Sequence, residues 1–170
     1  IVAAGKITGA LAIQQCFTNG SVDTDFGVSG VSSTVFPINS YFHGLTISPS
    51  GKIFATGMNY ASTVAEPRLI VASYLPNGSI DTRFGNGGVV VPYEAISNVG
   101  YAVAVQTDGR VLVTGSHRLP VTSESTYILV RLLGDSIMPS NIPTLSWHAL
   151  AMLTIGLGLI GWVYRNRFSS

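Results

Sequence analysis

The phrase "GSIDTRFGNGGV" at residues 78–89 appears once before, as "GSVDTDFGVSGV" at residues 20–31, and eight of the twelve positions are identical. Both copies are rich in the residue types that build turns, since Asp side chains accept backbone N–H bonds two residues on and Gly adopts positive φ. The repetition therefore predicts one structural unit that the chain forms more than once.

Each position of the shared D-T-x-F-G-x-x-G pattern has a structural interpretation. The aspartate is expected to form an Asx turn, the glycines to take positive φ, and the phenylalanine to anchor the loop as a large apolar side chain. We therefore predict a corner rather than a ligand loop. The residues assigned to it are Asp23, Phe26, Gly27, Asp81, Phe84, Gly85 and Gly88.

A calcium loop is the alternative for this phrase, because "DTDFG" spaces two acids as such a loop does. The second copy has Arg83 where the first has Asp25, and that cation would expel a metal ion. Both copies also lack the further oxygen ligands and the closing Glu of a helix–loop–helix site. We predict no metal and no cofactor here.

The repeat extends beyond the corner. "GKIFATG" at 51–57 returns as "GRVLVTG" at 109–115, with the same offset as the two corner phrases. "IVAAG" at 1–5 matches "IFATG" at 53–57 with a shorter offset. The difference in length between the two offsets falls in the connection 58–68, which we expect to be a surface loop.

Short apolar, β-branched runs between turn signals predict strands, and we count ten before residue 134. One unit is expected to combine the runs at 31–36, 43–48, 52–57 and 69–75. Four strands per repeat predict an all-β fold of repeated antiparallel blades, a partial β-propeller. Two and a half units do not close a ring of four to eight blades, so we expect the C-terminal fragment of a longer propeller.

Other candidate sites are weak. "PSGK" at 49–52 and "TDGR" at 107–110 predict two-residue hairpins whose basic residue is solvated. His43 and His117 have no acid or second His at ligand spacing, so packing or surface positions are expected. Cys16 is the only cysteine, which excludes an internal disulfide. The net charge of +1 carries no signature of nucleic-acid binding.

The repeats resemble the Delta-60-repeat family of bacterial β-propeller proteins. The resemblance rests on "LPNGSIDTRFGNGGVV" at 75–90 and "AVAVQTDGRVLVTG" at 102–115, and it covers about residues 1–137. The third copy departs from the pattern after "LLGDS" and never reaches D-T-x-F-G. The family implies a secreted or surface-exposed repeat array, and it has no catalytic residues to carry over.

The C-terminal tail has a different composition. Leu145–Tyr164 contains no Asp, Glu, Lys or Arg. A helix needs about 20 apolar residues to cross a bilayer, so this segment predicts a transmembrane helix. Trp147 lies at one end, and Trp162 and Tyr164 lie at the other, as interfacial aromatic residues do. The basic tail 165–170 then predicts a cytoplasmic C-terminus, with the repeats outside.

The same tail resembles an IPTL-CTERM sorting signal, which exosortase-type membrane peptidases process in Gram-negative bacteria. The matching residues are Ile142, Pro143, Thr144, Leu145, Trp147, Arg165 and Arg167. The family pattern has two residues between Leu and Trp and a Gly after Trp, whereas here Ser146 alone intervenes and His148 follows. The resemblance implies a sorting motif within the linker 138–144 and a processing peptidase as partner.

Together these expectations describe a non-enzymatic exported protein. Repeats 1–137 would bind an unknown surface ligand or act as a scaffold, and the tail would hold them at the cell envelope until cleavage releases them. Two alternatives remain open from the sequence. One is a propeller enzyme, lactonase-like or quinone-dependent, with its site in blades outside this sequence; the other is a permanently anchored receptor ectodomain.

Overall fold

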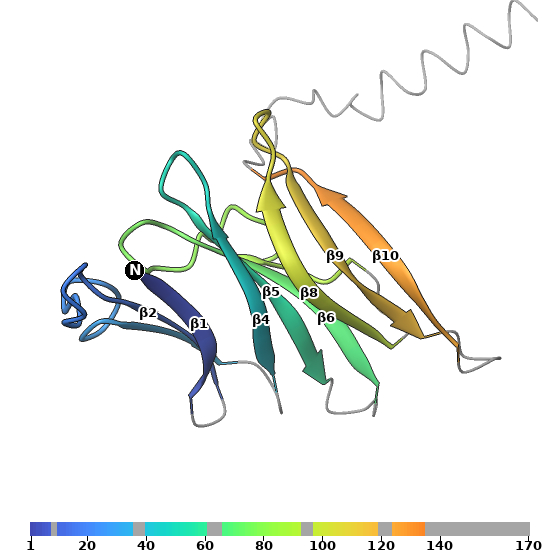
Figure 1. Ribbon diagram of the computed structural model, residues 1–170, viewed down its shortest axis with the longest axis horizontal. Coiled ribbons are helices and arrows are strands. Elements are labelled where there is room, and N and C mark those ends of the chain that lie inside the picture. The colour runs from blue at the N-terminus through green and yellow to red at the C-terminus, as the bar shows by residue number, and fades with distance from the viewer. Residues whose placement is uncertain (8–9, 36–39, 61–65, 93–96, 119–123, 135–170) are drawn as a thin grey trace, which may run out of the picture. The chain divides into compact units, whose positions relative to one another are not determined.

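The computed structural model describes residues 1–7, 10–35, 40–60, 66–92, 97–118 and 124–134 (Figure 1). These residues form ten strands and contain no helix, which confirms the predicted all-β class and the strand count. Accordingly, no helix in this part of the chain has the length and apolar character needed to cross a bilayer. The linker 138–144, the predicted membrane helix 145–164 and the tail 165–170 lie outside the described residues.

The strands form three antiparallel sheets. The first sheet has the order β1 (Val2–Ile7), β2 (Ala10–Gln15), β3 (Val31–Val35). The second has the order β4 (Tyr41–Ile47), β5 (Ile53–Tyr60), β6 (Pro67–Tyr74), β7 (Val89–Val90). The third contains β8 (Asn98–Val105), β9 (Val111–Arg118) and β10 (Ser125–Leu132), with β9 in the middle.

The boundary between sheets lies one strand later than the sequence predicts. The run at 31–36 is predicted to open the second unit, but β3 pairs with β2 and closes the first sheet. The corner is the reason, because it folds the chain back so that the strands on either side of it bond to each other. The Gln15 N–H donates to the Gly30 carbonyl at 3.2 Å, and the Ser73 N–H donates to the Gly88 carbonyl at 2.9 Å.

The period of the repeat is visible in the strands themselves. β9 and β10 follow β5 and β6 with the same offset that separates the two corner phrases, at their starts and at their ends. A β-bulge also recurs with this offset, between Phe42 and Gly44 in β4 and between Gly100 and Ala102 in β8. The connection 58–68 is only partly the predicted loop, because β5 continues to Tyr60 and β6 begins at Pro67.

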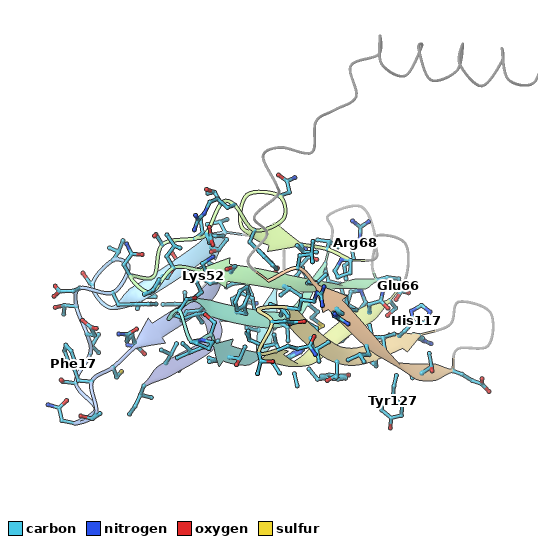
Figure 2. The ribbon with its side chains drawn as sticks, turned by 90° about the horizontal axis from the view of Figure 1, so that it is seen from above. Phe17, Lys52, Glu66, Arg68, His117 and Tyr127 are labelled. Atoms are coloured by element: carbon cyan, nitrogen blue, oxygen red, sulfur yellow. The ribbon has the colours of Figure 1, made fainter. Side chains whose placement is uncertain are left out.

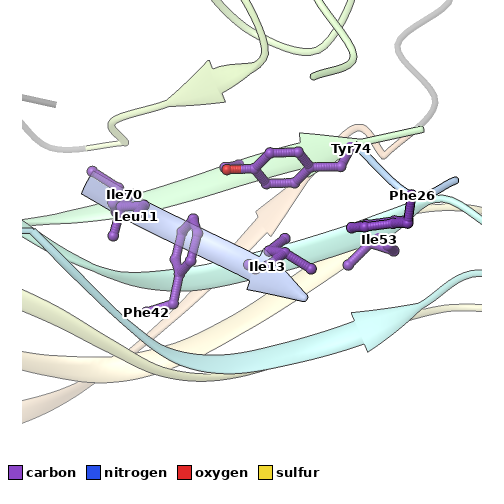
Figure 3. Close-up of a cluster of buried hydrophobic side chains, with 9 residues drawn as sticks. Leu11, Ile13, Phe26, Phe42, Ile53, Ile70 and Tyr74 are labelled. Atoms are coloured by element: carbon purple, nitrogen blue, oxygen red, sulfur yellow. The ribbon is translucent and has the colours of Figure 1, made fainter. Parts of the chain in front are cut away.

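Two apolar clusters hold the three sheets together. The first joins the first and second sheets through Leu11, Ile13 and Phe26 on one side and Phe42, Ile53, Ile70 and Tyr74 on the other (Figure 3). The second joins the second and third sheets and contains Phe54, Leu69, Val71, Phe84, Val111, Val113 and Val130. The middle sheet is therefore covered on both faces.

This double coverage explains why β6 reads as a continuous apolar run rather than an alternating one. Its residues serve the two clusters in turn, with Ile70 and Tyr74 facing the first sheet and Leu69 and Val71 facing the third. The Tyr74 hydroxyl lies 2.8 Å from the Thr34 hydroxyl of β3, which adds a hydrogen bond between the sheets. Burial raises the pKa of Tyr74 to about 12, so the phenol is neutral at physiological pH.

The described residues cover only one of the two faces of the third sheet. Tyr127 and Leu129 of β10 occupy the repeat positions of Leu69 and Val71 in β6. Tyr127 is 96% exposed and Leu129 is 66% exposed, whereas Leu69 and Val71 are fully buried. Figure 2 shows Tyr127 projecting away from the β10 ribbon.

Candidate functional site

The two corners share the same Asx turn. The backbone N–H of Asp25 donates to the carboxylate of Asp23 at 3.2 Å, and that of Arg83 donates to Asp81 at 3.3 Å. These are the Asx turns that the repeated phrase predicts. The Asp23 and Asp81 N–H groups in turn bond the carbonyls of the preceding strands at 3.0 and 2.8 Å.

The glycines of the corners take the backbone conformation expected of them. Gly27 has φ of 58° and Gly85 of 56°, and Gly88 has φ of 98°. A Cβ on Gly27 would collide with the Val31 carbonyl, and one on Gly85 would collide with the Val89 carbonyl. A side chain at either position would thus meet both backbone strain and a steric clash.

The corner phenylalanines are anchors between sheets. Phe26 and Phe84 are each 2% exposed. Phe26 lies in the cluster between the first and second sheets, and Phe84 lies in the cluster between the second and third. The Phe84 ring meets Phe54 edge to face, with centroids 5.5 Å apart. Each corner is therefore fastened to the contact between its sheet and the next.

Lys52 is largely shielded from solvent in an ion pair, contrary to the solvated position that its hairpin motif predicts. Its Nζ lies 3.0 Å from an Asp81 carboxylate oxygen, and the two side chains are 15% and 4% exposed. Burial disfavours the charged carboxylate, but hydrogen bonds from Lys52 and Arg83 outweigh that effect and hold the pKa of Asp81 below its usual value. The two repeated phrases of one unit are thus joined by an ion pair.

The hairpins that carry these basic residues also differ from the prediction. The Ser48 N–H bonds the Lys52 carbonyl at 2.8 Å and the Gly51 N–H bonds the Ser48 carbonyl at 2.9 Å, which makes a three-residue loop at 49–51. The turn at Gln106–Arg110 has the same bonds. Both loops place a glycine at positive φ before the basic residue, as three-residue hairpins commonly do.

Five side chains from three sheets lie beside one another in an arrangement that the sequence pattern does not reveal, which we call the edge-strand strip. It contains Lys6 of β1, Tyr41 and His43 of β4, Tyr101 of β8 and Ser116 of β9. Strands β4 and β8 are edge strands at equivalent positions of successive repeats, and β1, which corresponds to β5 in the repeat, is the edge strand of the first described sheet. Figure 1 shows β4 and β8 adjacent, and the contacts between their residues agree.

The described contacts within the strip form two groups, Lys6 with Tyr41 and His43 with Tyr101 and Ser116. Lys6 Nζ lies 4.5 Å from the centroid of the Tyr41 ring and donates to the Tyr41 hydroxyl at 3.4 Å. The His43 and Tyr101 rings are tilted by 31° with centroids 5.8 Å apart. The Ser116 hydroxyl donates to the Tyr101 hydroxyl at 3.2 Å. Each ring of the strip is therefore held by a polar group or a second ring beside it.

The β-bulges explain why His43 and Tyr101 meet. Each is the extra, unpaired residue of its bulge, and the two occupy equivalent positions of successive repeats. A bulge turns the local side chain away from its regular direction, and bulges are frequent beside functional sites. His43 Nδ1 also lies 3.0 Å from the Gly100 carbonyl, which fixes the imidazole against β8.

His117 is placed differently. Its Nδ1 lies 2.7 Å from Oδ1 of Asn98, which is 1% exposed. Within the described ranges no three His, Cys, Asp or Glu side chains gather as metal ligands would. The polar contacts described for the two imidazoles are hydrogen bonds, from His43 to the Gly100 carbonyl and from His117 to Asn98.

A depression of about 510 Å³ lies beside β3 and between the two corners. The only charged residue among those that line it is Asp25, and the rest of its wall is small hydroxyl, amide and aliphatic groups. The lining therefore does not offer a group of charged or polar side chains suited to one kind of ligand. Among the described residues, the edge-strand strip is the stronger candidate for a functional surface.

The predicted sorting residues Ile142, Pro143, Thr144, Leu145, Trp147, Arg165 and Arg167 lie outside the described part of the chain. No protein-family model matches this sequence, and comparison with curated proteins finds no significant match.

Proposed function

We propose that this chain is a non-enzymatic binding and scaffolding protein whose repeats are β-propeller blades of the Delta-60-repeat type. The observation that carries the proposal is the corner built twice. Asp23 and Asp81 direct their carboxylates to groups of their own repeat, and Phe26 and Phe84 fasten each sheet to the next. The most recognisable residues of the repeat are thereby used for architecture, so the ligand contacts must come from the residues that vary between repeats.

The open face of the third sheet supports a propeller-type array. Tyr127 and Leu129 present to solvent the positions that Leu69 and Val71 bury against a following sheet. A further sheet of the same kind would cover them through the same type of contact. Continuation of such contacts around a ring is how propeller blades protect their faces and edges.

We further propose that the tail exports this scaffold to the cell surface. Leu145–Tyr164 would span the inner membrane, with the repeats outside, and the motif beginning at Ile142 would be cut by an exosortase-type peptidase. The support is the length of the uncharged segment, its aromatic ends, Arg165 and Arg167. Cleavage would release the repeats to the outer surface or the medium.

Three versions of the full chain behind an export signal test this proposal: the native tail, Pro143→Ala with Thr144→Ala, and Leu153→Arg with Leu157→Arg. Each charge at mid-bilayer costs about 2.5–3.5 kcal/mol on insertion scales, so the arginine version should not anchor. The Pro-Thr version should anchor and accumulate uncut. The measurements are membrane fractionation, product length and protease access to the repeats in intact cells.

The contrary result is equally clear. If the native and arginine versions fractionate alike as uncut soluble protein, the membrane span is wrong. If the native and Pro-Thr versions anchor with the same uncut length in a host that contains the peptidase, the sorting motif is wrong. Repeats that are protected from external protease would contradict the proposed surface location.

A further inference from the structure

We infer that Asn86, in the second corner, is a site of spontaneous covalent modification, at which the side-chain amide is converted to aspartate and isoaspartate. Asn86 precedes Gly87, and further Asn-Gly steps begin at Asn19 and Asn77. The hydrogen bonds of the folded chain single out Asn86 among these three. The inference goes beyond the proposed function, because the reaction needs no ligand and no particular location of the chain.

The reaction uses the backbone nitrogen of the residue that follows the asparagine. The Gly87 nitrogen attacks Cγ of Asn86, its proton passes to solvent, and the Cγ–Nδ2 bond breaks to release ammonia. One water molecule then opens the resulting cyclic imide at either carbonyl, which gives aspartate or isoaspartate. The net change converts an amide and a water into a carboxylic acid and ammonia. A following glycine favours the attack, because it has no Cβ to obstruct the approach of its nitrogen.

The turn at Asn86 leaves both reacting groups accessible. The Asn86 N–H donates to the Val89 carbonyl at 2.8 Å, and the Val89 N–H donates to the Asn86 carbonyl at 3.3 Å. The two glycines between them have φ of 61° and 98°, as a two-residue turn of this kind requires. Asn86 and Gly87 are exposed. Among the described residues, nothing accepts from the Gly87 N–H and nothing bonds the Asn86 side chain.

Asn77 is also exposed, but hydrogen bonds hold both of its reacting groups. The Gly78 N–H donates to the Leu75 carbonyl at 2.9 Å, so the proton that must leave is already engaged. The Asn77 amide oxygen accepts from the Ser79 N–H at 3.0 Å and from the Ser79 hydroxyl at 2.7 Å. These bonds must break before the Gly78 nitrogen can attack the Asn77 side chain.

Asn19 has the equivalent set of bonds. The Gly20 N–H donates to the Phe17 carbonyl at 3.0 Å. The Asn19 amide oxygen accepts from the Ser21 N–H at 3.0 Å and from the Ser21 hydroxyl at 2.7 Å. The same dipeptide therefore has two restrained copies in this fold, at Asn19 and Asn77, and one unrestrained copy at Asn86.

The first corner supplies a matched comparison for the turn at Asn86. Its Val28 N–H donates to the Val31 carbonyl at 2.8 Å, and the Val31 N–H donates back to the Val28 carbonyl at 3.1 Å. Val28 takes the repeat position of Asn86 and has no amide to lose. Ser29 takes the position of Gly87 and has φ of 53°, so this turn accommodates a serine. The two corners thus have one geometry and different chemistry.

Conversion would alter the second corner and leave the first unchanged. It adds a carboxylate to an exposed turn, and isoaspartate also lengthens the backbone by a methylene group. The lengthened residue pairs with Val89, which begins β7 and continues into the pairing of β7 with β6. Isoaspartate at Asn86 should therefore weaken the attachment of β7 to the middle sheet, so the state of this turn records the time since a chain was made.

Peptide mapping of the full chain in detergent micelles tests the inference, after timed incubation at physiological temperature and pH. Cleavage after Lys and Arg places the three sites in separate peptides, at 7–52, 69–83 and 84–110. Asn86 should convert about tenfold faster than Asn19 or Asn77 in the folded chain, because hydrogen bonds must break before the latter react. Labelling with an isoaspartyl methyltransferase identifies the isoaspartate product. The rate at Asn86 should rise from neutral to mildly alkaline buffer, since the attacking nitrogen must lose its proton.

The controls separate the dipeptide from its structural setting. In the chain unfolded by urea the three rates should converge, since each asparagine precedes a glycine. Asn86→Val and Gly87→Ser introduce the residues of the first corner, so the turn should be retained. The valine variant should abolish conversion at this position, and the serine variant should slow it. Circular dichroism verifies that both variants keep their sheets.

Three outcomes would overturn the inference. Equal conversion at all three sites of the folded chain would show that the hydrogen bonds do not select Asn86. Conversion of Asn86 in urea but not in the folded chain would show that the turn protects it. A folded Gly87→Ser chain that converts at the native rate would reject attack by this backbone nitrogen.

Discussion

The ion pair between Lys52 and Asp81 links the hairpin phrase of a repeat to its corner phrase. The hairpin before β5 supplies the cation and the corner after β6 supplies the anion, with a separation of 3.0 Å. Sequence spacing could not reveal the pair, because β5 and β6 must first fold antiparallel to bring the two turns to one end of the sheet. In the third repeat the basic residue of the hairpin has a different partner, because Arg110 pairs with Asp108 of its own hairpin.

Asp81→Asn should destabilise the protein by about 3 kcal/mol, because it leaves the Lys52 ammonium without this carboxylate in a site that is largely buried. Asparagine keeps an oxygen for the Asx turn, so the loss reports the charge rather than the turn. Urea unfolding measures the difference. Asp108→Asn is the control at an exposed pair and should cost much less. Equal losses in both variants would contradict the role assigned to the buried pair.

The contribution of Asp81 should also depend on pH in a defined direction. Because the pKa of Asp81 is lowered in the folded state, its stabilisation is complete above the unfolded value of about 4 and is lost as pH falls through the lower folded value. The gap in unfolding free energy between native chain and Asp81→Asn should therefore be constant near neutrality and close in acid. If the gap in unfolding free energy widened in acid, the pKa of Asp81 would be raised rather than lowered in the folded state.

Strands β6 and β10 have equivalent positions in the repeat but differ in burial. The two strands have the same length and occupy equivalent positions of successive repeats. β6 is buried on both faces because a sheet lies on each side of it. A described sheet packs against only one face of β10, so Tyr127 is exposed where Leu69 is buried.

Leu69→Ala should cost about 2–5 kcal/mol, as large-to-small changes in a packed core do. Tyr127→Ala should fall within about 0.5 kcal/mol of the native chain, because the side chain has almost no contact to lose. Thermal unfolding of the two variants in parallel is the measurement. A loss at Tyr127 as large as that at Leu69 would mean that another surface covers β10 in solution.

At the scale of the whole molecule, the middle sheet should be the most stable part of the described chain. β5 and β6 have bonded strands on both sides and sheets on both faces, whereas β1 and β10 are edge strands. Native-state hydrogen exchange should therefore be slowest for the amides of β5 and β6 and faster for β1 and β10. β9, central in a sheet with one open face, is the internal control and should be intermediate. Uniform protection over all three sheets would contradict this order.

Much of this architecture could be predicted from the repeated phrase. Asp23 and Asp81 with their glycines indicated the corners, and the spacing of apolar runs indicated ten strands and an all-β class. The sheet boundary at β3 could not be predicted in this way, because apolar runs do not state which neighbour they pair with. The edge-strand strip was equally hidden, since His43 and Tyr101 acquire their meaning from two bulges and the approach of β4 to β8.

The corner has a consequence for how such a gene can change. Its Asx turn and its bonds to the preceding strand are made within one repeat, and the length difference between copies falls in the connection 58–68. Unequal recombination between two such coding segments would gain or lose a whole unit while keeping the Asx turn and the strand bonds of every surviving corner. The bulge residues, which the corner does not constrain, are then free to diverge from copy to copy, as His43 and Tyr101 already have.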